Sequence, residues 1–197
     1  MVATGVVVVT NQSARSWLGP QPACKIVLRT LREVRCVERL LVCNFTGGPL
    51  SYDLDAEVVL MEQSWAGPPP PTAVHAAVAK LVQGSAVVCC HAETPLVPAA
   101  SIERCAEAVL GGAAAAQTVK AVRAYVPTTG RWVEADVPAP VLGTVAFDPQ
   151  VCQWDRFPGR LPAGKLAFVP VTRKQALSLA DDGDRELLQS LEFAGCI

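Results

Sequence analysis

The chain has 197 residues, a net charge of −1 and 51% hydrophobic residues, a balance typical of a folded globular protein rather than of a disordered one. Lys and Arg are scattered, which argues against a nucleic acid as partner. The apolar runs fall well short of the ~20 residues that a membrane helix needs, and the N-terminus lacks a basic segment ahead of its valines. We therefore expect a single domain over residues 1–197, located in the cytoplasm and independent of membranes.

Strands and helices are predicted to alternate along most of the chain, because apolar runs and helical periodicities follow one another. The predicted strands cover residues 5–9, 39–45, 56–62, 85–91, 141–148 and 165–171. The predicted helices lie within 24–40, 71–83, 98–111 and a C-terminal stretch expected to break at 181–184. Residues 113–126 fit either type, since their alanines favour a helix and their valines a strand.

Alternation of this kind implies right-handed crossovers between parallel strands. The expected architecture is an α/β fold with a mostly parallel, doubly wound sheet and helices on both faces, as in Rossmann-like nucleotidyltransferases.

Residues 89–91 read Cys-Cys-His and raise the question of a metal or thiol site. Adjacent strand residues point to opposite faces, so Cys89 and Cys90 are not expected to share one metal ion. Reactive thiols need an accessible, electropositive setting, and these cysteines lie in an apolar run. A thiol or redox protein is the less favoured alternative.

Four stretches carry a resemblance to a known family: residues 71–81 (PTAVHAAVAKL), 91–115 (HAETPLVPAASIERCAEAVLGGAAA), 141–152 (VLGTVAFDPQVC) and 170–180 (PVTRKQALSLA). In order and spacing they resemble the 2-C-methyl-D-erythritol 4-phosphate cytidylyltransferases of isoprenoid biosynthesis. The resemblance implies a CTP-dependent, Mg²⁺-dependent nucleotidyl transfer. It also implies a homodimer formed through an arm that leaves the sheet, a region matched here by residues 125–137.

The first loop departs from that family, whose Ala-Ala-Gly-x-Gly-x-Arg-x-Gly lets backbone N–H groups approach a triphosphate. Residues 10–20 read TNQSARSWLGP here, so the inner glycines are absent and Trp17 stands in the loop. Arg15 and Lys25 are the weak candidates for catalytic residues. The candidate nucleotide-binding residues are Thr10, Asn11, Ser13, Arg15, Thr72 and His91.

The metal-binding positions depart as well. The family's strand ends in His-Asp-Ala-Ala-Arg-Pro, with the aspartate on Mg²⁺, whereas this chain reads His-Ala-Glu-Thr-Pro with Ala92 at the aspartate's place. Glu93 is the weak candidate for a metal ligand, and a solvated turn glutamate is the simpler interpretation. The family's second metal-binding carboxylate falls within residues 173–175, which read Arg-Lys-Gln here. Positively charged side chains thus stand where the family has a ligand for Mg²⁺.

We therefore expect a divergent cytidylyltransferase-like protein, a pseudoenzyme whose CTP-dependent transfer is lost or greatly weakened. Mg²⁺ and CTP are its ligands only if activity is retained; otherwise a small phosphorylated ligand or nucleotide is the expected partner. The alternative is an active transferase on a sugar or polyol phosphate, with Glu93 and Asp148 or Asp155 as relocated metal ligands and Arg15 on the phosphate.

The aromatic, basic loop 153–160 allows two interpretations. Trp154 and Phe157 either cover a ligand at the carboxyl edge of the sheet or fill a vacated pocket there, and the second is favoured.

Overall fold

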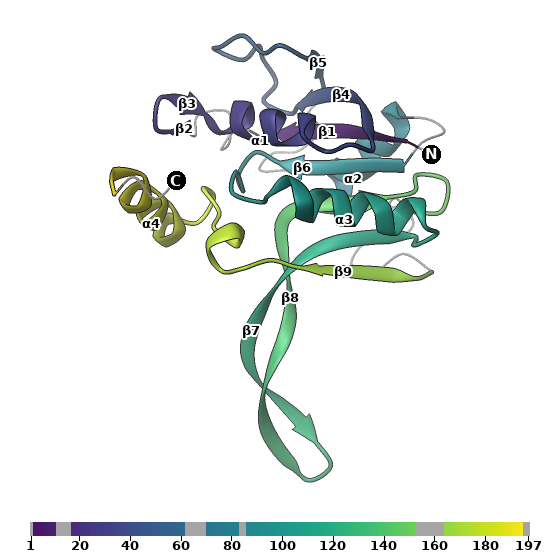
Figure 1. The fold of residues 1–197 in the computed structure, drawn as a ribbon, viewed down its shortest axis with the longest axis vertical. Coiled ribbons are helices and arrows are strands. Elements are labelled where there is room, and N and C mark those ends of the chain that lie inside the picture. The colour runs from purple at the N-terminus through teal and green to yellow at the C-terminus, as the bar shows by residue number, and fades with distance from the viewer. Residues whose placement is uncertain (1, 11–16, 62–69, 83–85, 153–163, 195–197) are drawn as a thin grey trace.

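A seven-stranded mixed sheet organises the chain in the computed structural model, which describes residues 2–10, 17–61, 70–82, 86–152 and 164–194 (Figure 1). The strands lie in the order β5-β4-β1-β6-β8-β7-β9. Within this sheet β8 is antiparallel to its neighbours, and the other strands share one direction. The strand bounds are β1 Ala3–Val9, β4 Val37–Asn44, β5 Glu57–Leu60, β6 Ala86–His91, β7 Ala115–Thr128, β8 Arg131–Phe147 and β9 Leu166–Pro170.

Helices cover both faces of this sheet, as the sequence predicted. The helix bounds are α1 Ala23–Arg32, α2 Pro71–Leu81, α3 Ala99–Leu110 and α4 Asp182–Phe193. Helices α1 and α3 pack on one face and α2 on the other (Figure 1). None of the helices in the described ranges is long and apolar enough to cross a membrane.

The central strand β1 is buried on both faces because its valines alternate between two cores. Val7 and Val9 pack with α1 and α3, whereas Val6 and Val8 pack with α2. Cys90 and Cys89 divide in the same way across β6, the first toward α1 and α3 and the second toward α2. The expectation that these two thiols lie on opposite faces is confirmed.

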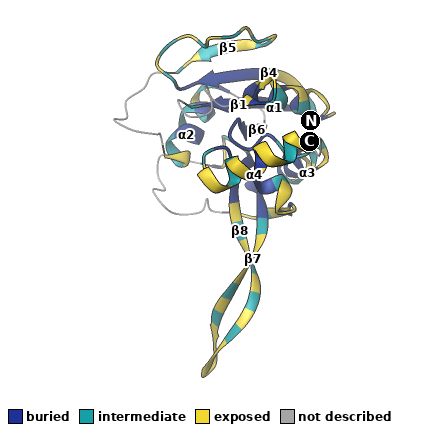
Figure 2. Cartoon of the chain, turned by 90° about the vertical axis from the view of Figure 1, so that its left-hand side faces the viewer, coloured by how far each residue is buried: buried dark blue, intermediate teal, exposed yellow. Residues whose placement is uncertain are grey.

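Residues 113–126, open between helix and strand in the sequence, form β7, which pairs with β8 from Ala115–Phe147 out to Thr128–Arg131. The outer part of this hairpin leaves the sheet as a twisted two-stranded ribbon (Figure 2). Every residue from 120 to 140 is half-buried or exposed. The arm is longer than the segment 125–137 that the sequence suggested, because strand pairing continues beyond it on both sides.

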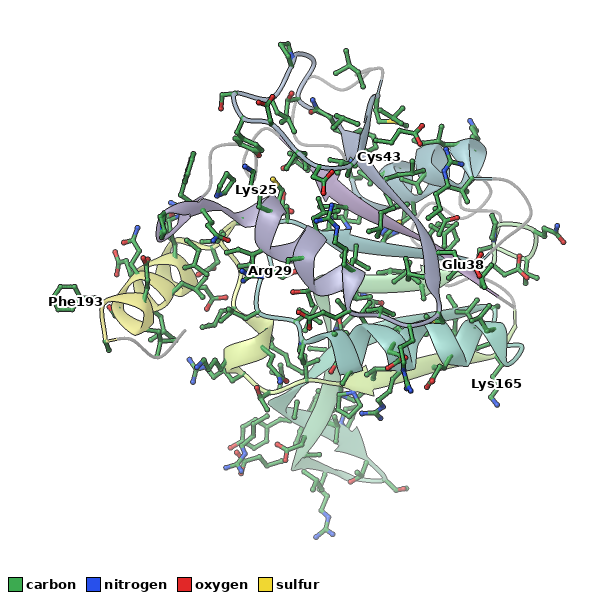
Figure 3. The ribbon with its side chains drawn as sticks, turned by 45° about the horizontal axis from the view of Figure 1, so that its top comes forward. Lys25, Arg29, Glu38, Cys43, Lys165 and Phe193 are labelled. Atoms are coloured by element: carbon green, nitrogen blue, oxygen red, sulfur yellow. The ribbon has the colours of Figure 1, made fainter. Side chains whose placement is uncertain are left out.

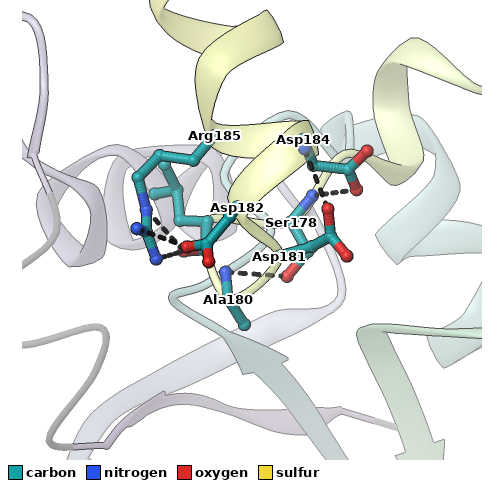
Figure 4. Close-up of polar contacts among 7 residues, drawn as sticks. Ser178, Ala180, Asp181, Asp182, Asp184 and Arg185 are labelled. Atoms are coloured by element: carbon teal, nitrogen blue, oxygen red, sulfur yellow. Dashed lines mark hydrogen bonds and ion pairs between the residues drawn. The ribbon is translucent and has the colours of Figure 1, made fainter.

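Residues 181–184 begin a helix instead of breaking one. The Asp181 carboxylate accepts a hydrogen bond of 2.9 Å from the Asp184 N–H and caps α4. The Asp184 carboxylate accepts from the Ser178 N–H at 3.0 Å, and the Arg185 guanidinium donates to the Leu179 carbonyl at 2.8 Å (Figure 4). The expected break is therefore wrong, since short polar side chains stabilise a helix start by bonding its free N–H groups.

Gly5 provides a test of the packing around β1. A Cβ added there would lie 2.9 Å from Leu40 Cδ2 and 2.9 Å from Val37 Cγ1. Gly5→Val, which would extend the valine run, is therefore expected to lower the free energy of unfolding by about 2 kcal/mol through overpacking, despite the better strand propensity of valine. Urea unfolding measures this. Gly48→Ala is the control, because its added Cβ meets nothing within 4 Å, and it should stay within about 0.5 kcal/mol of wild type. Equal stability of Gly5→Val and wild type would refute the packing argument.

Candidate site at the carboxyl edge of the sheet

Three neighbouring strands end together at one edge of the sheet. Val9 of β1 pairs with Asn44 of β4, and Val8 pairs with His91 of β6. Thr10 directly follows β1, and Glu93 lies two residues after the end of β6. Ligands of doubly wound α/β sheets bind outside the carboxyl ends of the strands, so this edge is the candidate site.

A row of four polar side chains crosses this edge. Thr10 Oγ1 donates a hydrogen bond of 2.5 Å to Glu93 Oε1. Glu93 Oε2 lies 4.0 Å from His91 Nδ1, and His91 Nε2 lies 3.4 Å from Nε2 of His75 on α2. The exposed fractions of Glu93, His91 and His75 are only 3%, 2% and 4%. The row is therefore part of the protein interior rather than a surface open to a ligand.

Burial keeps both histidines neutral. It lowers the pKa of His75 to about 3, assisted by the nearby His91, and lowers the pKa of His91 to about 4. The contact between the two rings is then a neutral hydrogen bond in which one Nε2 donates and the other accepts. A neutral His91 forms no ion pair with Glu93, despite the 4.0 Å separation.

Glu93 differs from the solvated turn residue that the sequence favoured. Its carboxylate accepts from Thr10, and its backbone carbonyl accepts a hydrogen bond of 2.7 Å from the Leu179 N–H. Leu177 and Leu179 are each 2% exposed and pack with Leu188 of α4. The C-terminal segment thus lies against the loop after β6 and fixes Glu93 from outside.

The other candidate residues are placed as follows. Thr72 is half-buried at the start of α2, and Lys25 is exposed in the first turn of α1. Ala92 is fully buried within the core cluster that includes α1 and α3. Asn11, Ser13, Arg15, Trp154, Asp155 and Phe157 lie outside the described residues, so the interpretations that depend on them remain predictions.

An aromatic pair follows the first loop. Trp17, in a two-stranded hairpin of β2 (Trp17–Leu18) and β3 (Gln21–Pro22), is 50% exposed. Its ring meets Tyr52 edge to face at a centroid distance of 6.2 Å. The Tyr52 hydroxyl accepts a hydrogen bond of 3.1 Å from the Cys24 thiol on α1. The Cys24–Tyr52 hydrogen bond links the start of α1 to the loop after β4.

Asp148 lies at the opposite edge of the sheet from Glu93. It follows Phe147, which pairs with Val87 at the beginning of β6, because β8 runs antiparallel. Four strand steps, ~13 Å, separate Val87 from His91 at the end of β6, and Glu93 lies in the turn beyond that end. The Asp148 carboxylate accepts from the Gln150 N–H at 2.8 Å and stabilises a local turn. Asp148 and Glu93 are too far apart to bind one cation.

The described residues do not fit a Mg²⁺ site. Magnesium prefers several oxygen ligands in octahedral geometry. No group of three or more His, Cys, Asp or Glu able to hold a metal ion occurs within the described ranges. At residues 173–175, the Gln175 side-chain oxygen accepts from the Thr172 N–H at 2.9 Å and so serves the local turn.

Comparison with known proteins depends on the fold, since no protein-family model and no curated protein sequence matches the chain. A structure of CMP:2-keto-3-deoxy-manno-octonic acid synthetase complexed with CTP matches at a TM-score of 0.70 and 12% identity, over 99% of this chain and 100% of the other. A 2-C-methyl-D-erythritol 4-phosphate cytidylyltransferase from Thermus thermophilus matches at 0.70 and 16% identity, over 98% and 100%.

The fold is that of the cytidylyltransferases. A further match is Rv0371c of Mycobacterium tuberculosis H37Rv in complex with manganese, at a TM-score of 0.64 and 16% identity over 96% of this chain and 99% of the other. The cytidylyltransferase resemblance seen in the sequence is thus confirmed for the architecture. At identities of 12–16%, the similarity to these proteins is one of fold.

Sequence reasoning missed His75 and the segment 177–179. His75 lies directly after Val74 in a helix whose buried residues are Val74, His75 and Val78. The signal in the sequence was the position of His75 among the apolar residues of the predicted helix, since a polar residue on an apolar helix face faces the sheet. The Leu-Ser-Leu of 177–179 carried the signal of a buried extended segment.

The neutral histidines predict acid sensitivity. The pKa values of both histidines in the folded protein lie below the ordinary ~6.5 of the unfolded chain. Their contribution to folding stability is therefore complete above pH ~6.5 and is lost as the pH falls from ~6.5 toward 4. Each histidine then lowers the free energy of unfolding by ~1.4 kcal/mol per pH unit. His75→Leu should remove about half of their joint slope in urea unfolding between pH 6.5 and 5.

Val78→Ala is the control for this measurement, since Val78 is fully buried on α2 and does not titrate. It should lower stability at every pH and leave the slope unchanged. A His75→Leu slope equal to that of wild type would show that the histidines are already protonated in the folded state.

Proposed function

We propose that residues 1–197 form a single domain of the cytidylyltransferase fold in which CTP-dependent nucleotidyl transfer is lost or greatly weakened. The observation that carries the proposal is the position of Glu93. This carboxylate, beside the strand end where the resembling family binds Mg²⁺, is buried and bonded to Thr10. The protein would then act by binding a small phosphorylated ligand or nucleotide.

Recruiting Glu93 to a cation would require structural change. The ion would have to reach a carboxylate that is 3% exposed and whose Oε1 already accepts a hydrogen bond from Thr10, so the surrounding side chains would have to move. The Leu179 contact to its carbonyl would also have to open for access from the C-terminal side. Such a cost opposes metal binding before any ligand is gained.

The charges after β9 support the same proposal. Arg173 and Lys174 are exposed there, at the carboxyl edge, because β9 runs parallel to β7. These positively charged side chains repel Mg²⁺ and attract phosphate groups. Nucleotidyl transfer depends on metal and cationic neutralisation together, and loss of one such element commonly costs ~10²–10³ in rate.

The experiment is titration of the protein with CTP by calorimetry, in excess Mg²⁺ and again in EDTA. We expect any CTP affinity to differ by less than ~3-fold between the two conditions, because Glu93, the carboxylate beside the end of β6, is buried. Pyrophosphate release from a panel of nucleoside triphosphates with sugar or polyol phosphates should stay at background. Tight, Mg²⁺-dependent CTP binding would refute the proposal.

Glu93→Gln separates the two roles of this residue. If Glu93 is structural, the variant lowers the melting temperature and leaves the ratio of CTP affinities in Mg²⁺ and EDTA unchanged. Loss of a Mg²⁺ effect on CTP binding in Glu93→Gln would identify Glu93 as a metal ligand and support the active-transferase alternative.

We also propose that the β7–β8 arm forms a homodimer. Val122, Tyr125 and Trp132 on the arm are 37%, 68% and 68% exposed. A two-stranded ribbon is only marginally stable alone in water, and large exposed apolar side chains indicate a protein contact. A second copy of the chain would cover both strands, as the resemblance implies.

Light scattering after gel filtration tests this assembly. The wild-type protein is expected at twice the monomer mass, and Tyr125→Ser with Trp132→Ser is expected to dissociate it by removing the apolar contact area. Phe193→Ser is the control, since Phe193 is 98% exposed on α4 away from the arm, and it should remain dimeric (Figure 3). A monomeric wild-type protein at ~100 µM would refute the dimer.

A further inference from the structure

A cavity lies between the β2–β3 hairpin, α1, the loop after β6 and α4. Its volume is about 390 Å³, within the range of small-molecule sites. The residues that line it are Leu18, Gly19, Pro20, Gln21, Ile26, Arg29, Leu96 and Glu192. The walls therefore come from three distant parts of the chain, which the fold brings together beside α4 (Figure 1).

The base of this cavity is apolar. Leu18 is buried in a cluster with Leu177, Leu179 and Leu188, and Ile26 and Leu96 pack against that cluster while remaining partly exposed. Partly exposed aliphatic side chains that line a cavity gain free energy when an apolar group covers them. An aliphatic group is the chemistry that this part of the cavity fits.

Two opposite charges stand on separate walls. Arg29 is exposed on α1, on the wall where Ile26 lies (Figure 3), and Glu192 comes from the last turns of α4. Neither side chain forms an ion pair with any described residue, whereas Arg32, Arg35 and Arg185 pair with Asp55, Glu103 and Asp182. Arg29 offers the planar fork that binds a carboxylate, and Glu192 offers an acceptor for an ammonium group.

The hairpin is shaped to admit the carboxylate of Glu192. Gly19 has a φ of +61°, and a Cβ there would lie 2.5 Å from Glu192 Oε1. A side chain at position 19 would be strained by this φ, and it would displace the carboxylate of Glu192 from its place beside the hairpin.

We propose that this cavity binds a small zwitterion with an aliphatic body, of the class of the branched-chain amino acids. Glu192 would repel a simple anion, and Arg29 would repel a simple cation. A ligand that carries both charges can instead place its carboxylate near Arg29 and its ammonium group near Glu192. The aliphatic body covers Leu18, Ile26 and Leu96. The lining of this cavity shares no residue with the carboxyl-edge row, and the proposal does not depend on the proposed function.

Binding would fasten α4 to the body of the protein, because the ligand touches the hairpin, α1 and α4 together. A ligand that binds only the folded state raises the melting temperature in proportion to the logarithm of its concentration. Both charges are open to water, so each contributes modestly and a millimolar affinity is expected.

The test is titration of ¹⁵N-labelled protein with L-leucine and with two analogues that each lack one charge, 4-methylpentanoate and 3-methylbutylamine. L-Leucine should give saturable shifts at residues 18–29, 96 and 192, with an affinity at least ~5-fold above either analogue. Absence of saturation at 50 mM L-leucine, or equal affinity for an analogue with one charge, would overturn the proposal.

Charge variants assign the walls. Arg29→Gln should weaken L-leucine about fivefold without weakening 3-methylbutylamine, which no longer meets a like charge, and Glu192→Gln should weaken L-leucine without weakening 4-methylpentanoate for the same reason. Arg104→Gln, an exposed cation on α3 outside the cavity, is the matched control and should bind L-leucine like wild type. Equal effects of Arg29→Gln and Arg104→Gln would show that the contact is nonspecific.

Leu96→Trp provides a test that does not depend on charge. Its larger ring should fill the cavity and abolish the L-leucine shifts while CTP binding stays as in wild type. CTP binding that responds to Leu96→Trp would place the nucleotide in this cavity and overturn the assignment. Failure of the carboxyl-edge proposal would appear instead as Mg²⁺-dependent CTP binding, with the L-leucine shifts unaffected.

Discussion

Burial of β1 on both faces is the constraint on which the rest of the structure depends. Its valines alternate between the core of α1 and α3 and the core of α2, so the strand is held in the middle of the sheet. Parallel pairing to β4 and β6 then brings three strand ends to one edge. The proximity of Thr10, His91 and Glu93 follows from apolar packing that none of these residues takes part in.

Polar groups at that edge have become part of the core. Burying them is favourable only when hydrogen bonds replace water, and Thr10–Glu93 and His75–His91 do this in sequence across the edge. A carboxylate used in this way is held by its partners and by the segment of Leu179. At this edge the polar side chains contact one another, and both histidines are neutral because burial lowers their pKa.

The sequence predicted the architecture well because apolar periodicity reports directly on burial. The strands of residues 5–9 and 85–91 and the helix that begins at Pro71 were placed nearly as observed. The direction of β8 and the contacts between distant side chains were harder to predict. Strand β8 runs antiparallel, and so carries Asp148 to the far edge, because the hairpin turn between Thr128 and Arg131 joins it to β7, whereas residues 113–126 fitted a helix as well as a strand. The His75–His91 contact joins α2 to β6, and only the packing of that helix on the sheet determines it.

The similarity to cytidylyltransferases separates what a fold needs from what a reaction needs. Identities of 12–16% accompany TM-scores of 0.64–0.70, because a core tolerates many apolar exchanges when volume and pattern are kept. Chemistry at a strand end tolerates few, since it depends on particular charges at particular atoms. In this chain the apolar pattern supports the architecture, and Ala92, Arg173 and Lys174 set the charge near the carboxyl edge. The fold therefore decides which residues meet at that edge, and the chemistry of those residues decides which ligand fits there.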